Sequence, residues 1–343
     1  MTDGVLLREL AQDLTKAKYS IVIVDEAHER SVNTDVLIGM LSRVVKLREK
    51  RWIDAKEKGM DAPRPLRLVI MSATLRVNDF TKNSMLFSTP PPVVHIGARQ
   101  HPVTIHFNRR TVQDYVTEAI KKTSKIHTRL PPGGILLFMT GQQEVQTVCR
   151  KLSQRYAADA LSKYTIEAVK PAMSTRIAEP EAEEMDLGTA EDLDVDDDLD
   201  NEVQEDEEAL DSDDESLPLA ESDTPMHILP LYSLLPSSEQ QRVFEDPPEN
   251  TRLVVVATNV AETSITIPNI KYVVDCGRAK ERQIDPRSQV QSYDISWISK
   301  ASAAQRAGRA GRTGPGHCYR RYSSALYEVV FNDVSVAEIL GTP

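Results

Sequence analysis

Short apolar runs alternate with amphipathic segments in the first third of the chain. Ile21–Val24 and Leu68–Met71 are continuous apolar runs, as expected for strands buried on both faces of a parallel sheet. Between them, apolar residues recur at helical spacing over Asn33–Lys50, which predicts a helix with one stripe facing a core. This order of strand, helix and strand predicts an α/β unit.

The same alternation returns after Pro102 and predicts a second α/β unit. The expected strands are Ile135–Met139, His227–Leu231, Leu253–Ala257 and Tyr272–Asp275, and the expected helices are Gln142–Tyr156 and Ser302–Arg309. The fold class is therefore α/β, with a parallel sheet in each of two units and a boundary near Pro102.

An acidic block interrupts the second unit. Residues 177–241 hold 24 of the 52 Asp and Glu residues and no Lys or Arg, so the remainder has 41 basic against 28 acidic residues. Because Asp192–Glu215 has no aromatic residue and little apolar surface, we predict a disordered insertion over residues 175–224. The basic remainder suggests a polyanionic partner, although an ordinary solubilising surface explains it equally well.

Composition narrows the class of protein. The three cysteines (Cys149, Cys276 and Cys318) are far apart and form no CxxC pair, which favours a reduced intracellular protein over a disulfide framework or a zinc site. The opening MTDGVLLREL lacks the basic lead of a signal peptide, and no apolar run approaches the roughly 20 residues that span a bilayer. We therefore expect a soluble intracellular protein without a membrane segment.

Acidic and hydroxyl side chains follow the first two predicted strands. Asp25, Glu26 and His28 come directly after Ile21–Val24, and Ser72 follows Leu68–Met71. The carboxyl ends of parallel strands are where such sheets bind ligands. One carboxylate there could hold Mg²⁺ and the next could orient an attacking water, but acidic residues also commonly end a strand and face solvent. Ser72 could equally be a helix cap or a turn residue.

A glycine-rich arginine segment is the strongest chemical signal. On a continuous α-helix, Gln305, Arg309 and Arg312 share one face, with the bare backbone of Gly308 and Gly311 beside them. Two arginines presented together suit a transferring phosphoryl group, whose charge spreads over its oxygens. An RNA-phosphate patch or an exposed basic helix would use the same residues.

The run Val254–Ile267 leads from an apolar strand into a loop rich in hydroxyl and amide groups. Thr258, Ser264 and Thr266 belong to it. Such a loop can contact a nucleotide and a nucleic-acid backbone, and the alternative is a capped turn between a strand and a helix.

These segments together resemble a known family. DEAH, SAT, ATNVAETSITIP and QRAGRAGRTGPG occur in the order found in the DEAH-box branch of the RNA helicases that have two RecA-like domains. The resemblance implies an ATP-binding hydrolase that uses ATP and Mg²⁺ and binds RNA. It covers nearly the whole chain except the acidic insertion.

The resemblance also assigns roles to single residues. It implies that Asp25 and Glu26 serve Mg²⁺ and water, and that His28 and Ser72 couple hydrolysis to domain movement. It further implies that Gln305, Arg309, Arg312 and Ser264 reach the γ-phosphate, that Thr266 lies in the nucleotide loop, and that Phe244 stacks on adenine. Thr2, Asp3, Gly4 and Thr258 fall in segments that touch RNA, and Lys280–Ile298 matches a β-hairpin that helps to part strands.

The resemblance divides the chain into parts. We expect residues 1–101 to belong to the first RecA-like domain, residues 102–174 and 225–333 to the second, residues 175–224 to the insertion and residues 334–343 to the start of a winged-helix domain. Two departures stand out: Pro268 replaces an acidic residue that many relatives use for the ribose, and the GxGKT phosphate loop does not occur. We therefore predict that residues 1–343 alone do not hydrolyse ATP at a useful rate.

The acidic insertion and the PLYSLLP that follows it most resemble the nucleolar member of this family, which acts on U3 small nucleolar RNA in small-subunit ribosome assembly. This resemblance implies a role in ribosome biogenesis, nuclear and nucleolar localisation, a pre-rRNA or snoRNA partner, and a basic or activating protein that binds the insertion. The rival hypothesis is a non-catalytic RNA-binding or assembly protein that keeps the fold without turnover.

Overall fold

The computed structural model describes residues 1–15, 18–73, 78–97, 101–156, 224–262, 265–284, 291–334 and 337–340. The predicted insertion over residues 175–224 lies outside the described residues apart from Thr224. The predicted start of a winged-helix domain is described only at residues 334 and 337–340.

The N-terminal unit is built on one parallel strand pair. Its elements are α1 (Asp3–Gln12), β1 (Ile21–Val24), η1 (Ala27–Glu29), α2 (Val32–Glu57), β2 (Arg67–Ile70) and α3 (Asn78–Thr81). β1 and β2 pair in parallel from Ile21 opposite Arg67 to Val24 opposite Ile70. Ser31 begins α2 as its N-cap, because its hydroxyl accepts the backbone N–H of Thr34 at 3.2 Å.

One face of this strand pair carries the core of the N-terminal unit. Side chains of α1, β1 and α2 form the cluster, which includes Leu6, Leu10, Val22, Val24, Leu37 and Leu41. The outward residues Ile21 and Ile23 of β1 remain 51% and 60% exposed. The prediction that this strand is buried on both faces is therefore wrong for the described residues, because α1 and α2 pack on the same side of it.

The C-terminal unit contains a six-stranded sheet in the order β3-β10-β7-β4-β6-β5. All neighbouring strands in it are parallel. Its strands are β3 (Val103–Asn108), β4 (Gly134–Phe138), β5 (Met226–Leu231), β6 (Arg252–Ala257), β7 (Ile270–Asp275) and β10 (Gly316–Ser323). Its α-helices are α4 (Tyr115–Arg129), α5 (Gln142–Tyr156), α6 (Ser237–Gln241), α7 (Lys300–Gly308) and α8 (Ser324–Val329). The short turns are η4 (Arg242–Phe244), η5 (Asn259–Ala261), η6 (Arg309–Gly311) and η7 (Glu338–Leu340).

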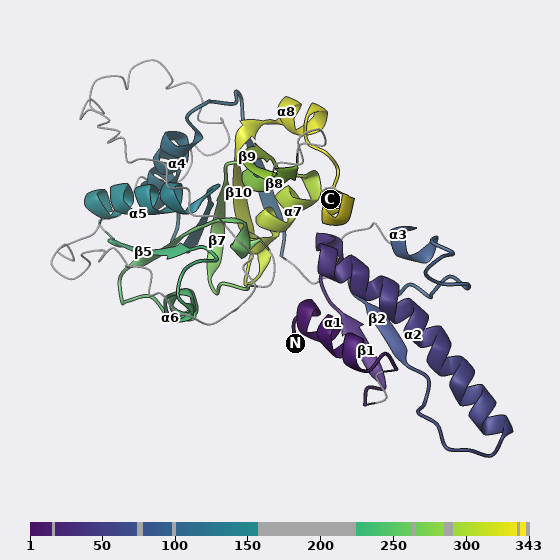
Figure 1. Cartoon of the computed structure of the whole chain (residues 1–343). Helices are drawn as coiled ribbons and strands as arrows, with labels where there is room; N and C mark the ends of the chain where they lie inside the picture. Colours follow the sequence, from purple (N-terminus) through teal and green to yellow (C-terminus); the bar gives the residue numbers. More distant parts are fainter. Residues whose placement is uncertain are drawn as a thin grey trace.

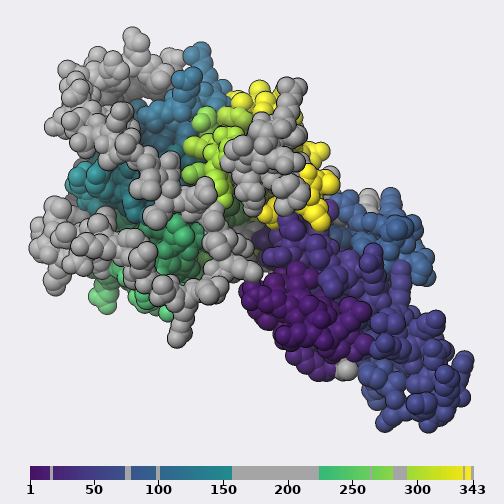
Figure 2. Space-filling view, in the orientation of Figure 1, coloured from purple at the N-terminus to yellow at the C-terminus, as the bar shows by residue number. Residues whose placement is uncertain are grey.

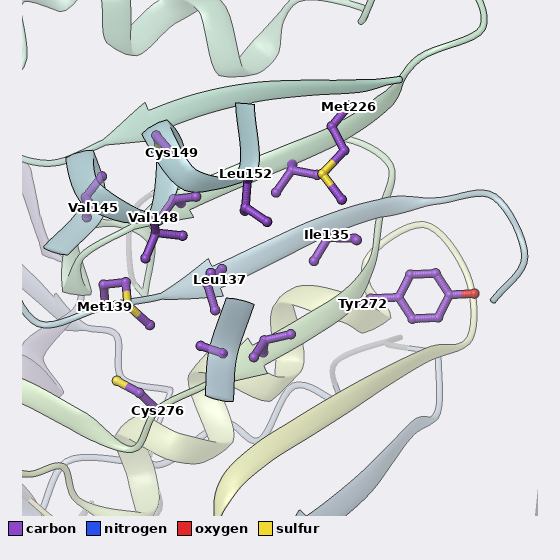
Figure 3. Close-up of a cluster of buried hydrophobic side chains, with 14 of the residues drawn as sticks. Ile135, Leu137, Met139, Val145, Val148, Cys149, Leu152, Met226, Tyr272 and Cys276 are labelled. Carbon is purple, nitrogen blue, oxygen red and sulfur yellow. The ribbon is translucent and has the colours of Figure 1, made fainter. Parts of the chain in front are cut away.

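Both faces of this sheet are covered. Alternate residues of β4 point to opposite sides: Ile135 and Leu137 pack with residues of α5, as Figure 3 shows, while Leu136 and Phe138 join a second cluster with Ala307 of α7. Every residue of β4 and β6 is buried. The predicted strands Ile135–Met139 and Leu253–Ala257 are thus confirmed, and both are buried on both faces of the sheet.

A hairpin projects from the end of β7. β8 (Arg278–Ile284) and β9 (Gln291–Trp297) pair antiparallel, with Arg278 opposite Trp297 at the base, which agrees with the hairpin expected over Lys280–Ile298. Figure 1 shows the two units as separate lobes, and Figure 2 shows the N-terminal unit meeting the C-terminal residues drawn in yellow. Of the helices that the structure describes, none is long and apolar enough to cross a membrane.

Candidate functional site

The carboxyl ends of β1 and β2 bring the DEAH and SAT segments together. The N–H of Met71 donates to the carbonyl of Val24 at 2.8 Å, and the N–H of Ala27 donates to the carbonyl of Met71 at 3.0 Å. Glu26 has a φ of 49°, in the left-handed region that non-glycine residues rarely adopt. Backbone strain of this kind is common at functional sites, and here it accompanies the sharp turn that follows Asp25.

His28 joins three parts of the site. Its Nδ1 accepts the N–H of Ala73 at 3.3 Å, next to Ser72, and lies 3.4 Å from Oε2 of Glu26. The side-chain amide of Gln305, on α7, lies 2.5 Å from its Nε2. The amide atom in this contact is Nε2 of Gln305, and the tautomer of His28 decides which of the two nitrogens donates. This hydrogen bond connects the two units directly.

The arginine segment bends at its second half. The α-helix expected over Ser302–Arg309 spans Lys300–Gly308, and the 3₁₀ turn Arg309–Gly311 follows it. The prediction that one α-helical face carries Gln305, Arg309 and Arg312 is therefore wrong. The 3₁₀ turn is closely packed at Gly311. A Cβ added there would lie 2.7 Å from the carbonyl oxygen of His101.

Arg309 is held by backbone carbonyls of its own unit. Its guanidinium donates to the carbonyl of Ile265 at 2.6 Å and to the carbonyl of Glu262. Burial lowers the pKa of Arg309, Arg312 lowers it further, and the charge of Glu26 opposes both. The charges of Glu26 and Arg312 therefore act on the pKa of Arg309 in opposite directions.

A buried charge network beside this site was not predicted. Arg306 is completely buried and donates to Oε2 of Glu262 at 3.0 Å and to Oδ1 of Asp275 at 2.9 Å. Burial by itself lowers the pKa of Arg306, but the two carboxylates outweigh burial and raise it. One sequence signal was available: the acidic residue Asp275 ends an apolar strand.

The other predicted residues differ in their exposure to solvent. Ser72 and Thr266 are exposed, Phe244 is 48% exposed on η4, and Thr258 is buried at the end of β6. Ser264 lies outside the described residues.

The predicted RNA-contacting segment at the start of α1 makes contacts with other residues of the chain. Thr2 is the N-cap residue of α1, and the carboxylate of Asp3 accepts the hydroxyl of Thr34. A side chain at Gly4 would meet no atom within 4 Å. The backbone of α1 is therefore open at Gly4.

The DEAH segment is also held from the C-terminal end of the chain. Glu338 donates its N–H to the carbonyl of Arg30 at 3.1 Å and accepts the N–H of Val32 at 3.0 Å. The negative charge of the Glu338 carboxylate is also favourable here, because the N-terminus of α2 is the positive end of the helix dipole. No pattern in the sequence pointed to this contact.

Comparisons with known proteins agree with these features. The helicase conserved C-terminal domain matches residues 203–314. The chain is 50% identical over 361 residues to "Probable ATP-dependent RNA helicase DHR1" of Saccharomyces cerevisiae, which covers 100% of this chain and 28% of that protein. It is 49% identical over 358 residues to "Probable ATP-dependent RNA helicase DHX37" of Homo sapiens, covering 95% of this chain and 30% of that protein. The crystal structure of the Escherichia coli DEAH/RHA helicase HrpB superimposes with a TM-score of 0.67 at 26% identity, over 99% of this chain and 33% of that one.

The chain belongs to the DEAH-box RNA helicases. The family is one of enzymes, and both curated relatives are named as ATP-dependent RNA helicases. This DEAH-box chain spans about 30% of their length. Its α/β class with parallel sheets, predicted from the apolar runs, is confirmed by the structure and by the likeness to HrpB.

The donor set of the DEAH segment fits Mg²⁺. Asp25 and Glu26 offer hard carboxylate oxygens, and one oxygen of Asp25 accepts the N–H of Glu26 at 2.9 Å. Within the described part of the chain, no group of three or more His, Cys, Asp or Glu residues could form a closed metal cage. The carboxylates of Asp25 and Glu26 suit Mg²⁺, because this ion keeps several waters and binds one or two carboxylates together with substrate phosphates.

Proposed function

We propose that this chain supplies the ATP-hydrolysing core of an RNA helicase that remodels RNA–protein particles, with its nucleotide site between the two units. The hydrogen bond between His28 and Gln305, with a separation of 2.5 Å, carries the proposal. It joins the segment that bears the carboxylates to the segment that bears the arginines. We also propose the domain boundaries of the sequence analysis, since the strands before and after residues 98–102 belong to different sheets.

Each side of the contact has a distinct task in this proposal. Asp25 holds Mg²⁺, which screens the charge of the phosphates when it is bound, and Glu26 orients the attacking water. Gln305, Arg309 and Arg312 stabilise charge on the γ-phosphate. Arg309 must leave the carbonyls of Glu262 and Ile265 to do so, and its two hydrogen bonds there are the cost of that movement.

The remaining nucleotide contacts are proposed from the motifs. Ser72 and Ser264 respond to the γ-phosphate, Thr266 contributes a hydroxyl to the nucleotide loop, and Phe244 stacks on the base. The exposure of Phe244 at 48% supports a stacking role, because a large aromatic ring left open to water gains from a planar partner. Thr2, Asp3, Gly4 and Thr258 belong to the proposed RNA-binding segments.

The proposed cellular setting is ribosome biogenesis. The acidic block and PLYSLLP support a nucleolar enzyme that acts on pre-rRNA or on a small nucleolar RNA. The 21 acidic residues of Glu179–Glu215 also suit a basic or activating protein. Crosslinking of the protein to RNA in cells tests this setting: recovery of U3 or pre-rRNA supports it, and recovery of messenger RNA alone contradicts it.

RNA-stimulated ATPase activity tests the catalytic proposal. We expect a polypeptide that joins these residues to a GxGKT loop to hydrolyse ATP faster with RNA. Glu26→Gln should lower kcat by a factor on the order of 10² to 10⁴, since it removes the group that activates water. Glu29→Gln is the matched control, because Glu29 is an exposed carboxylate of the same turn. RNA binding without turnover in the unsubstituted polypeptide would instead favour the non-catalytic assembly protein.

The acidic block permits a separate test of RNA competition. We propose that Glu179–Glu215 competes with RNA for the basic remainder of the chain. Deleting it should tighten RNA binding at low salt, and the gain should fade as salt rises, because both interactions are electrostatic. Unchanged affinity at low salt would remove the competition hypothesis and leave a protein partner as the role of the block.

A further inference from the structure

The turn between β7 and the β8–β9 hairpin is tightly packed. β7 ends at Asp275 and β8 begins at Arg278, and Gly277 between them has a φ of 72°. A Cβ at Gly277 would lie 2.5 Å from the ring of Tyr322 and 3.2 Å from the ring of Phe331. Neither the left-handed backbone nor the available space permits a side chain there. The hairpin therefore leaves the sheet in a direction that this turn fixes.

Arg306 bridges both sides of that turn. Its NH1 group donates to Oδ1 of Asp275 at 2.9 Å and to the carbonyl of Arg278 at 3.2 Å. Asp275 also accepts the N–H of Gly277 at 2.9 Å and, through its other oxygen, the hydroxyl of Tyr322 at 3.1 Å. One completely buried guanidinium thus holds the last residue of β7 and the first residue of β8.

The other end of the same guanidinium holds the nucleotide loop. Its Nε donates to Oε2 of Glu262 at 3.0 Å, and the second oxygen of Glu262 accepts the hydroxyl of Ser302 on α7. The planar fork of an arginine suits this task, because it presents several donors in a fixed geometry. A lysine ammonium has no such fork, so it cannot donate the same set of hydrogen bonds.

The neighbouring residue on α7 faces the N-terminal unit. Gln305 contacts His28, while Arg306 points inward to the base of the hairpin. Consecutive residues of a helix are fixed relative to one another, so a displacement of this helical turn moves both contacts together. The base of the hairpin is further packed by Arg278, whose guanidinium lies 4.6 Å from the ring centre of Tyr115 and 4.5 Å from that of Trp297.

We infer that Arg306 is a positioning residue that couples the DEAH segment to the β8–β9 hairpin. When the contact between His28 and Gln305 changes, α7 shifts and Arg306 carries the shift to the Asp275–Arg278 turn. The hairpin then changes its angle to the nucleic-acid strand that it meets. The use of this coupling in strand separation rests on the proposed function, whereas the mechanical link is testable without nucleotide.

Hydrogen exchange of residues 1–343 measures the link directly. Arg306→Lys should speed exchange of the amides at the hairpin base, such as Ala279 and Ile298, about tenfold more than exchange of β4 and β6 amides. Arg252→Lys is the matched control. Arg252 is also a buried arginine, and its guanidinium donates to backbone carbonyls including those of Gly133 and Ile126. The control should loosen those segments without a preference for the hairpin.

A double-mutant cycle separates coupling from simple destabilisation. His28→Ala should change exchange at the hairpin base by about threefold or more in the unsubstituted chain, and by less in the Arg306→Lys background. If Arg306→Lys does not fold, Tyr322→Phe takes its place, because it removes one hydrogen bond to Asp275 and keeps the ring. Equal loosening of every strand, or no response of the hairpin to His28→Ala, would overturn the inference. Neither result depends on ATP turnover, so a failure here leaves the proposed function to its own test.

Discussion

The two parallel sheets of this chain differ in how completely they are covered. In the C-terminal unit, β4 and β6 are buried along their whole length, and each face of the sheet has its own core. In the N-terminal unit, β1 buries only alternate residues. Yet the proposed carboxylates follow the less covered strand, and the proposed arginines follow the better covered sheet. Stability and chemistry are therefore distributed differently: the C-terminal unit holds most of the core, while catalysis requires both units.

Hydrogen bonds join the two units. They include the hydrogen bond between His28 and Gln305 and the two that Glu338 makes with Arg30 and Val32. A typical hydrogen bond contributes about 0.5–1.5 kcal/mol. Each of these hydrogen bonds is therefore small compared with the burial that holds either core together.

The largest effect is expected from substitutions that remove the contribution of the C-terminal unit to catalysis. Arg309→Ala or Arg312→Ala, in a polypeptide that also carries a GxGKT loop, should lower kcat by about 10³-fold or more, because the charge that these groups meet is greatest in the transition state. Steady-state kinetics should show a much smaller change in ATP affinity. Arg150→Ala is the control, since Arg150 is exposed on α5. A fall of less than about threefold in both variants would favour an RNA-binding role for these arginines.

The next effect compares the same substitution in the two sheets. Ile135 of β4 is 0% exposed, whereas Ile23 of β1 is 60% exposed. Ile135→Ala should lower the free energy of unfolding by about 2–5 kcal/mol, because it opens a cavity in a closed core. Ile23→Ala should cost less than about 0.5 kcal/mol. Urea unfolding followed by circular dichroism measures both, and a similar loss in both variants would show that the outer face of β1 is covered in solution.

The sequence predicted β1, β2 and four of the six strands of the larger sheet, but not the environments of these strands. The run IVIV of β1 and the run ILLF of β4 have the same pattern, so periodicity could not show that one is buried on a single face. Whether a second face is covered depends on which other segments pack there, and that information is not local. β10 escaped prediction for a related reason: its GHCYRRYS places two arginines in a central strand, where they are half-buried or buried between neighbours.

The sequence predicted which residues belong to the candidate site better than it predicted how these residues are arranged. The motifs identified His28 and Gln305 separately, but their hydrogen bond depends on how two units with different sheets are placed. The role of Arg306 required knowledge of what lies behind α7. Local sequence showed that three arginines follow Gln305, and only burial distinguishes Arg306, which holds the hairpin turn, from Arg309 and Arg312.

A third prediction concerns local opening of the two sheets. Amides of β1 and β2 should exchange with deuterium at least about tenfold faster than amides of β4 and β6, a difference of about 1.4 kcal/mol in opening free energy. The reason is that a strand pair with one open face loses fewer contacts when it opens. Peptide-resolved exchange on residues 1–343 measures the ratio, and equal rates would mean that the two sheets open as one.

The smallest expected signal comes from the thiols, which report on the C-terminal unit alone. Cys149, Cys276 and Cys318 are all buried there, and residues 1–101 contain no cysteine. Burial raises the pKa of Cys149 and of Cys276 to about 12, so at pH 8 only about one thiol in 10⁴ is the reactive thiolate. The folded chain should therefore show almost no labelling over minutes, and all three thiols should react in denaturant.

Paired with a probe in the other unit, this labelling distinguishes independent from joint unfolding. Trp52 lies on α2 of the N-terminal unit, so its fluorescence in a Trp297→Phe variant follows that unit alone. We expect the Trp52 transition at a lower urea concentration than the onset of thiol labelling, because the sheet with one open face is held by fewer buried contacts. Coincident transitions would contradict this order. They would show that the contacts of His28 and Glu338 bind the units into a single cooperative structure, despite their different cores.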